Sequence, residues 1–94
     1  MKHITIKERR FSKREGCWGI AYPDQNLIKI DPRLPRNKYV EILIHELMHI
    51  VQPYLEEDTV KDSSEVIAAY LLEKMEEKGW LASTLKKELN LEDV

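Results

Sequence analysis

The chain has 94 residues, of which 43% are hydrophobic and 34% are charged, and its formal net charge at pH 7 is −2. This composition excludes a disordered protein, and the length fits one domain with a thin core, expected over residues 1–94. No stretch approaches the roughly 20 apolar residues of a membrane span, residues 1–3 do not begin a signal peptide, and the single cysteine, Cys17, cannot form an internal disulfide. We therefore expect a cytoplasmic protein with no membrane partner.

The charges are unevenly distributed along the chain. Residues 1–40 hold ten Lys and Arg against four Asp and Glu, whereas residues 41–94 hold five against thirteen. The excess of positive charge in residues 1–40 suggests one alternative function, that of a nucleic-acid-associated protein. However, this segment lacks repeated aromatic residues and any known nucleic-acid-binding motif. Solvated surfaces explain the charges more simply, and we do not expect nucleic acid as a partner.

Three strands are expected first along the chain. Residues 3–7, 18–22 and 27–31 are rich in β-branched or aromatic side chains. The turn signal at 23–26 predicts that the last two strands form a hairpin. The segment 32–36 contains two prolines, which cannot continue a ladder of hydrogen bonds, so the sheet is expected to end there.

Helices are expected after the strands. Apolar residues recur at helical spacing from the expected N-cap, Asn37, to about Val51, and Pro53 ends this helix. The acidic segment 54–61 is expected to be a loop.

A second helix is expected from residue 62 or 63 to about Lys78, with Gly79 directly after its end. Its apolar stretch, residues 66–72, should be largely buried. A short third helix is expected over about 82–89. The order of elements predicts an α+β fold, in which a small antiparallel β-sheet of about three strands packs on two helices.

The most informative motif is His45-Glu46-Leu47-Met48-His49, which reads H-E-x-x-H. Residues i and i+4 share one face of a helix, so both imidazoles can reach one zinc ion, with Glu46 beside it to accept a proton from water. The alternative is a pair of core histidines. It leaves Glu46 unexplained, because an unpaired carboxylate in an apolar helix is costly. The motif therefore predicts a site for one Zn²⁺.

A third protein ligand is still needed. The extended motif H-E-x-x-H-x-x-G-x-x-H is excluded by Gln52 and Leu55, and no histidine follows His49. A carboxylate from the second helix is therefore expected, and Glu65, in the first turn of that helix with small residues on its own face, is the best candidate. The alternatives that remain open are Glu56, Glu57, Asp58, Glu73 and His3.

These residues predict a zinc-dependent endopeptidase that cleaves a peptide or protein substrate. Zinc lowers the pKa of a bound water, and Glu46 acts as general base on it. The strand at 27–30 is expected to be an edge strand that pairs with the substrate. Tyr54, Tyr70 and Tyr39 are nearby candidates for stabilising the oxyanion, and none is assigned. The alternative is a non-catalytic module that uses zinc for stability and regulates a partner.

The hairpin, the sequence H-E-L-M-H and a second helix that opens Glu65-Val66-Ile67-Ala68-Ala69-Tyr70 together resemble the minimal gluzincins and the ImmA/IrrE-type zinc metallopeptidases, over about residues 18–75. The resemblance implies a zincin-like minimal catalytic core, with His45, His49 and Glu65 as zinc ligands and Glu46 as general base. It also implies that the activity is latent.

Two further expectations concern the metal site. The acidic residues 90–94 are a candidate for a self-inhibitory contact at the metal. The larger thermolysin-like enzymes carry an aspartate four residues after the ligand glutamate, where this chain has Ala69, so any group that orients the zinc histidines must come from elsewhere. The sequence predicts no oligomeric state.

Overall fold

A computed structural model describes residues 3–80 of the chain. The third helix expected over about 82–89 and the acidic residues 90–94 lie outside this part. Within it, the chain forms three strands followed by two α-helices, which confirms the α+β fold expected from the sequence. The elements are β1 (Thr5–Glu8), β2 (Gly19–Tyr22), β3 (Leu27–Ile30), α1 (Arg36–Val51) and α2 (Glu57–Glu77).

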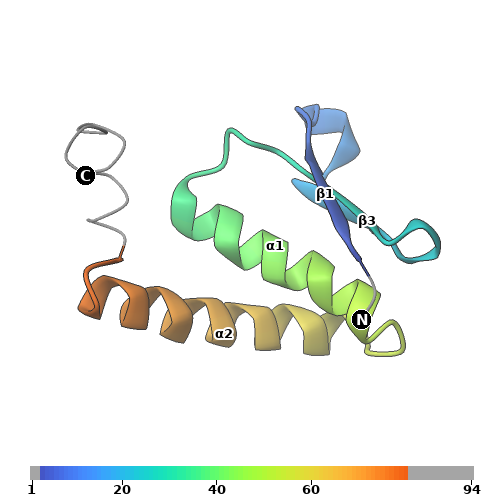
Figure 1. Cartoon of the computed structure of the whole chain (residues 1–94). Helices are drawn as coiled ribbons and strands as arrows, with labels where there is room; N and C mark the ends of the chain where they lie inside the picture. Colours follow the sequence, from blue (N-terminus) through green and yellow to red (C-terminus); the bar gives the residue numbers. More distant parts are fainter. Residues whose placement is uncertain (1–2, 81–94) are drawn as a thin grey trace.

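The elements form three layers, with α1 between the sheet and α2 (Figure 1). Each layer contributes buried apolar side chains to a thin core. Ile28 and Ile30 come from β3, Ile50 from α1, and Val60 and Ala68 from α2. Helix α1 is thus covered on both sides, which fixes the orientation of the histidine motif that it carries.

The sheet is mixed, and its strand order is β1-β3-β2. Strands β2 and β3 form the expected antiparallel hairpin, but β1 pairs in parallel with β3. The expectation of an all-antiparallel sheet is therefore wrong, and so is the assignment of 27–30 as an edge strand. A hairpin signal shows that two strands are neighbours, but it does not say on which side a third strand adds. Here β1 adds beside β3, which leaves β2 at the edge.

Small residues bring β2 close to α1. The register places Gly19 opposite Ile30 and Ala21 opposite Ile28, so all four share the face of the sheet that meets α1. A Cβ atom at position 19 would lie 2.8 Å from Cγ2 of Ile42. The edge strand therefore approaches the helix at a distance that only glycine permits at this position.

Helix α2 begins earlier than expected. Its first residue is Glu57, so the second half of the segment expected to be an acidic loop is helical. Acidic side chains in a first turn are stabilised by the helix dipole, and Glu57 and Asp58 occupy that turn. The end of the helix agrees with the prediction, since Gly79 adopts a φ of +76° directly after it.

The apolar stretch 66–72 of α2 is mostly exposed, so the expectation that it is largely buried is wrong. Only Ala68 is buried there, and Leu72 is half-buried. Among residues 3–80, α2 packs chiefly on α1, and a helix with one neighbour buries one stripe of side chains. The exposed residues include Val66 (56%), Ile67 (46%), Tyr70 (70%) and Leu71 (44%).

A buried carboxylate fastens the connection between β1 and β2 to the end of β3. Asp31 is fully buried and accepts hydrogen bonds from the Phe11 N–H at 2.9 Å and from the Arg33 N–H at 2.9 Å. The Arg33 guanidinium also donates to both Asp31 oxygens and, at 2.8 Å, to the Phe11 carbonyl. These hydrogen bonds hold the pKa of Asp31 well below its usual range. We call this group of hydrogen bonds among Asp31, Phe11 and Arg33 the Asp31 latch. It fixes the position of the connection that leads into the edge strand β2.

Candidate metal centre

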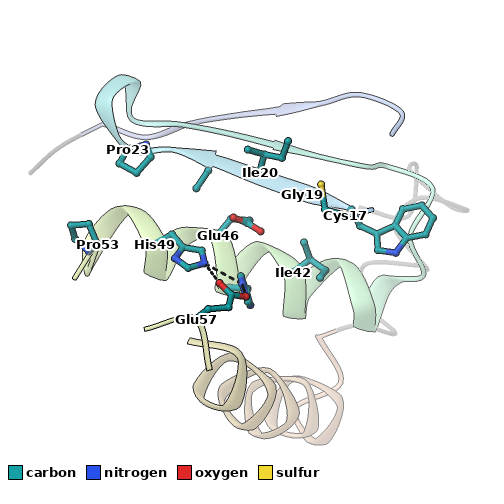
Figure 2. Close-up of a pocket in the computed structure, with 12 residues that line it drawn as sticks. Cys17, Gly19, Ile20, Pro23, Ile42, Glu46, His49, Pro53 and Glu57 are labelled. Carbon is teal, nitrogen blue, oxygen red and sulfur yellow. Dashed lines mark hydrogen bonds and ion pairs between the residues drawn. The ribbon is translucent and has the colours of Figure 1, made fainter. Parts of the chain in front are cut away.

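A cavity of about 570 Å³ lies between β2 and α1 (Figure 2). The edge strand forms one wall, the face of α1 that carries the H-E-x-x-H motif forms the other, and the first turn of α2 closes one side. The cavity thus brings together three segments that are separate in the sequence. Its polar side chains include His45, Glu46, His49 and Glu57.

Three side chains in this cavity point toward one another. His45 Nε2 lies 2.9 Å from one carboxylate oxygen of Glu57, and His49 Nε2 lies 2.9 Å from the other. The two Nε2 atoms are 3.2 Å apart. Ligand atoms from all three residues lie within 4.8 Å of one another, and the group can hold a metal ion. The i, i+4 spacing on α1 brings the imidazoles together as expected, and the start of α2 supplies the carboxylate.

The expected third ligand, Glu65, is not part of this group. It lies eight residues after Glu57, or about 12 Å further along α2. Its side chain is exposed and lines a different groove, with Lys38 and Glu41 of α1. Since α2 begins at Glu57 rather than at residue 62 or 63, the first turn that approaches His49 contains Glu57 instead.

Glu57 was among the alternatives that the sequence left open, together with Glu56, Asp58, Glu73 and His3. Of these, only Glu57 joins the two histidines in the described part of the chain. The run Glu56-Glu57-Asp58 was the signal that could have identified it, because acidic residues favour the first turn of a helix.

Glu46 is nearly buried, with 9% of its surface exposed, which agrees with its expected place in a buried helix. Its side chain faces β2, whereas His49 and Glu57 meet on the side of α1 that is nearer α2 (Figure 2). Burial raises the pKa of Glu46 above its usual value, and so does the Glu57 charge. The charges of His45 and His49 and the Ala21 backbone amide act in the opposite direction. A carboxylate of this kind is poised to accept a proton.

The tyrosines considered for the oxyanion lie elsewhere. Tyr54 and Tyr70 are 78% and 70% exposed, and neither lines the cavity. Tyr39 donates its hydroxyl hydrogen bond to Glu8 at 2.7 Å. Partial burial and the Glu8 carboxylate raise its pKa to about 12. Within residues 3–80, no hydrogen bond reaches Nδ1 of either histidine, so the group that orients the imidazoles is not found there.

The free edge of β2 runs along the cavity. The Asp31 N–H donates to the Trp18 carbonyl at 2.9 Å, which makes this a hydrogen-bonded pair of the antiparallel ladder. Because such pairs alternate, Gly19 and Ala21 direct their backbone polar groups away from β3. The described part of the chain therefore presents an open strand edge beside Glu46 and the three side chains that can hold a metal ion.

Neither of the two helices in the described part combines the length and apolarity needed to cross a membrane. Comparisons with models of protein families, with curated proteins and with solved structures gave no match to this chain.

Proposed function

We propose that this chain is a zinc-dependent peptidase, in which His45, His49 and Glu57 hold the metal and Glu46 is the general base. The observation that carries the proposal is the convergence of the two imidazoles with the Glu57 carboxylate, beside the buried Glu46 that directly follows His45 on α1. A zincin-like core of this kind agrees with the resemblance to the minimal gluzincins, with Glu57 in place of Glu65.

Zinc is supported by the donor set and its spacing. Two imidazole nitrogens and one carboxylate oxygen are the ligands found in catalytic zinc sites that leave one position open. Tetrahedral ligands about 2.1 Å from zinc are separated from one another by about 3.4 Å. The 3.2 Å between the histidine Nε2 atoms is close to that value, and the 2.9 Å contacts to Glu57 are slightly shorter.

Glu46 supplies the proton chemistry in this proposal. When bound, zinc would lower the pKa of a water molecule and polarise the scissile carbonyl. The raised pKa of Glu46 makes its carboxylate a better base than an exposed glutamate. After accepting a proton from the attacking water, the side chain would pass that proton to the leaving amine. The close approach of Gly19, where a Cβ atom would lie 3.3 Å from Cγ of Glu46, keeps this side chain under the strand edge where a peptide bond would lie.

The edge of β2 positions the substrate. An extended peptide can add a strand beside Gly19 and Ala21, because their outward backbone groups have no partner within the sheet. Main-chain pairing holds the scissile bond between the strand and α1. It also accepts many sequences, so selectivity must come from side-chain cavities along the strand.

The test compares wild-type protein with Glu46→Gln. We expect both to bind one zinc ion per chain, measured by metal analysis after dialysis. Only wild type is expected to cleave an unfolded protein, followed by mass spectrometry, with a loss of at least about 100-fold for the variant. Equal zinc with no cleavage either by wild type or by a chain that lacks residues 90–94 would instead favour the non-catalytic, zinc-stabilised module.

Latency remains part of the proposal. The acidic residues 90–94 lie outside the described part of the chain, and their expected contact with the metal is untested. Deleting them should raise the cleavage rate while zinc content stays constant. An unchanged rate would contradict self-inhibition by this segment, but it would leave the peptidase proposal intact.

A further inference from the structure

A second cavity, of about 470 Å³, lies beyond one end of the metal-binding cavity. We call it the Trp18 cavity, because Trp18 lines both cavities and forms the wall that they share. The apolar residues Phe11, Leu34 and Pro35 also line it, and Lys13 and Arg33 provide two cations. None of these residues belongs to the metal centre.

Each of the two cationic side chains has N–H groups available to a ligand. Lys13 is exposed, and no ion pair involves it within the described residues. Arg33 uses Nε and Nη2 to bind Asp31 and the Phe11 carbonyl, so its guanidinium is fixed in place. These bonds leave Nη1 without a partner among residues 3–80, and the side chain is 48% exposed. A guanidinium held by a buried carboxylate loses little conformational freedom when it binds an anion.

The strand edge leads from one cavity to the other. Ala21 lines the metal-binding cavity together with Glu46, and Trp18 is three residues earlier, about 10 Å along the strand. A peptide paired with the free edge of β2 would therefore bring a side chain two or three positions from the scissile bond to the Trp18 cavity. The peptide backbone itself would not need to bend.

We propose that the Trp18 cavity is a substrate subsite that binds an acidic side chain, with the aliphatic part of Glu or Asp on Trp18 and the carboxylate between Lys13 and Arg33. This inference rests on the proposed peptidase function for the path of the peptide. The binding step itself depends only on β2 and the cavity. Apolar walls with two cations at the rim fit a carboxylate-bearing side chain better than a neutral or basic one.

The first arm of the test maps cleavage sites. Zinc-loaded wild type digests a mixture of unfolded proteins, and mass spectrometry identifies the cut bonds. We expect Asp and Glu to be enriched about fivefold two or three residues from the cut, on one side only. Lys13→Glu should lose this enrichment or shift it to Lys and Arg. Arg14→Glu, the matched control, makes the same charge change in the neighbouring residue, which does not line the cavity, and should retain it.

The second arm measures binding without cleavage. Zinc-loaded Glu46→Gln protein is titrated with two blocked, fluorescent octapeptides of neutral residues that differ by one Glu or Gln. We expect about fivefold tighter binding of the Glu peptide, lost when Lys13→Glu is added and kept when Arg14→Glu is added. Equal affinity for both peptides, or equal loss in both variants, would overturn the subsite. A preference for Glu without cleavage by wild type or by the chain that lacks residues 90–94 would support the subsite and contradict the peptidase.

Discussion

Gly19 of the edge strand lies so close to Ile42 of α1 that a Cβ atom there would come within 2.8 Å of the Ile42 Cγ2 atom. The same Cβ would lie 3.3 Å from Cγ of Glu46, so the glycine also sets where the proposed base sits under the strand. The separation between β2 and α1 is the width of the proposed active site. Gly19, which has no side chain, permits the close approach that sets this width.

Replacing Gly19 with alanine is therefore expected to force β2 and α1 apart. We expect a loss of about 1–3 kcal/mol of unfolding free energy, measured by urea denaturation. The cleavage rate should fall more than zinc affinity does. The proposed metal ligands lie on α1 and α2 and can move together, whereas Glu46 would lose its position relative to the strand.

A double-mutant cycle with Ile42→Ala provides the control. Removing Cγ2 of Ile42 relieves the closest contact, so Gly19→Ala should cost less in that background. Identical costs in both backgrounds would show that the close approach of these two residues does not limit the strand–helix distance.

The choice between Glu57 and Glu65 is testable with two identical substitutions. Glu57→Gln should weaken zinc binding by at least about 100-fold, because partners that only orient zinc ligands already contribute about 10–100-fold. Glu65→Gln should leave zinc affinity unchanged, since Glu65 lines another groove. Competition with a chromophoric chelator measures both affinities. The opposite result would restore Glu65 as the ligand and show that α2 approaches α1 differently.

The helical part of the site follows from local sequence. His45 and His49 meet because four residues make about one turn, and the apolar residues around Glu46 predicted that it lies on a buried part of α1. The start of α2 was not predictable in the same way. Glu57 can belong to a solvated acidic loop or to a first helical turn, and packing against α1 decides between them.

The arrangement of the sheet depends on contacts between distant segments. The alternating pattern identified all three strands to within two residues, and the turn identified the hairpin. Which strand becomes the edge depends on the side of the hairpin to which β1 adds. The hydrogen bond from Phe11, which follows β1, to Asp31, which follows β3, holds β1 beside β3. A short sequence window does not contain both partners of such a contact. The edge strand beside the cavity was therefore assigned to the wrong residues.

The Asp31 latch predicts how stability depends on pH. Its carboxyl group has a lower pKa in the folded chain than in the unfolded chain, so the folded state binds fewer protons at acidic pH. The stabilisation is complete above about pH 5 and is lost as the pH falls below about 4. Asp31→Asn should lower the thermal midpoint at pH 7 by about 10 °C. It should also flatten the decline in stability between about pH 5 and pH 2.

Glu15 offers a comparison for that prediction. Its pKa is lowered to about 2 by the Arg9 guanidinium and by the Ser12 amide, but the pair is exposed to solvent. Glu15→Gln should therefore change the acid response much less than Asp31→Asn does. If both variants flatten the curve equally, burial of Asp31 does not strengthen the latch.

Two valines on α2 test which face of this helix is covered. Val60 is fully buried, whereas Val66, six residues later, is 56% exposed. Val60→Ala should lower the unfolding free energy by about 2 kcal/mol, because it leaves a cavity between the helices. Val66→Ala removes the same atoms but exposes no cavity, and alanine favours helix, so its effect should be within about 0.5 kcal/mol. Urea denaturation of the full chain measures both. A large cost at Val66 would show that residues beyond 80, or a second molecule, cover this face.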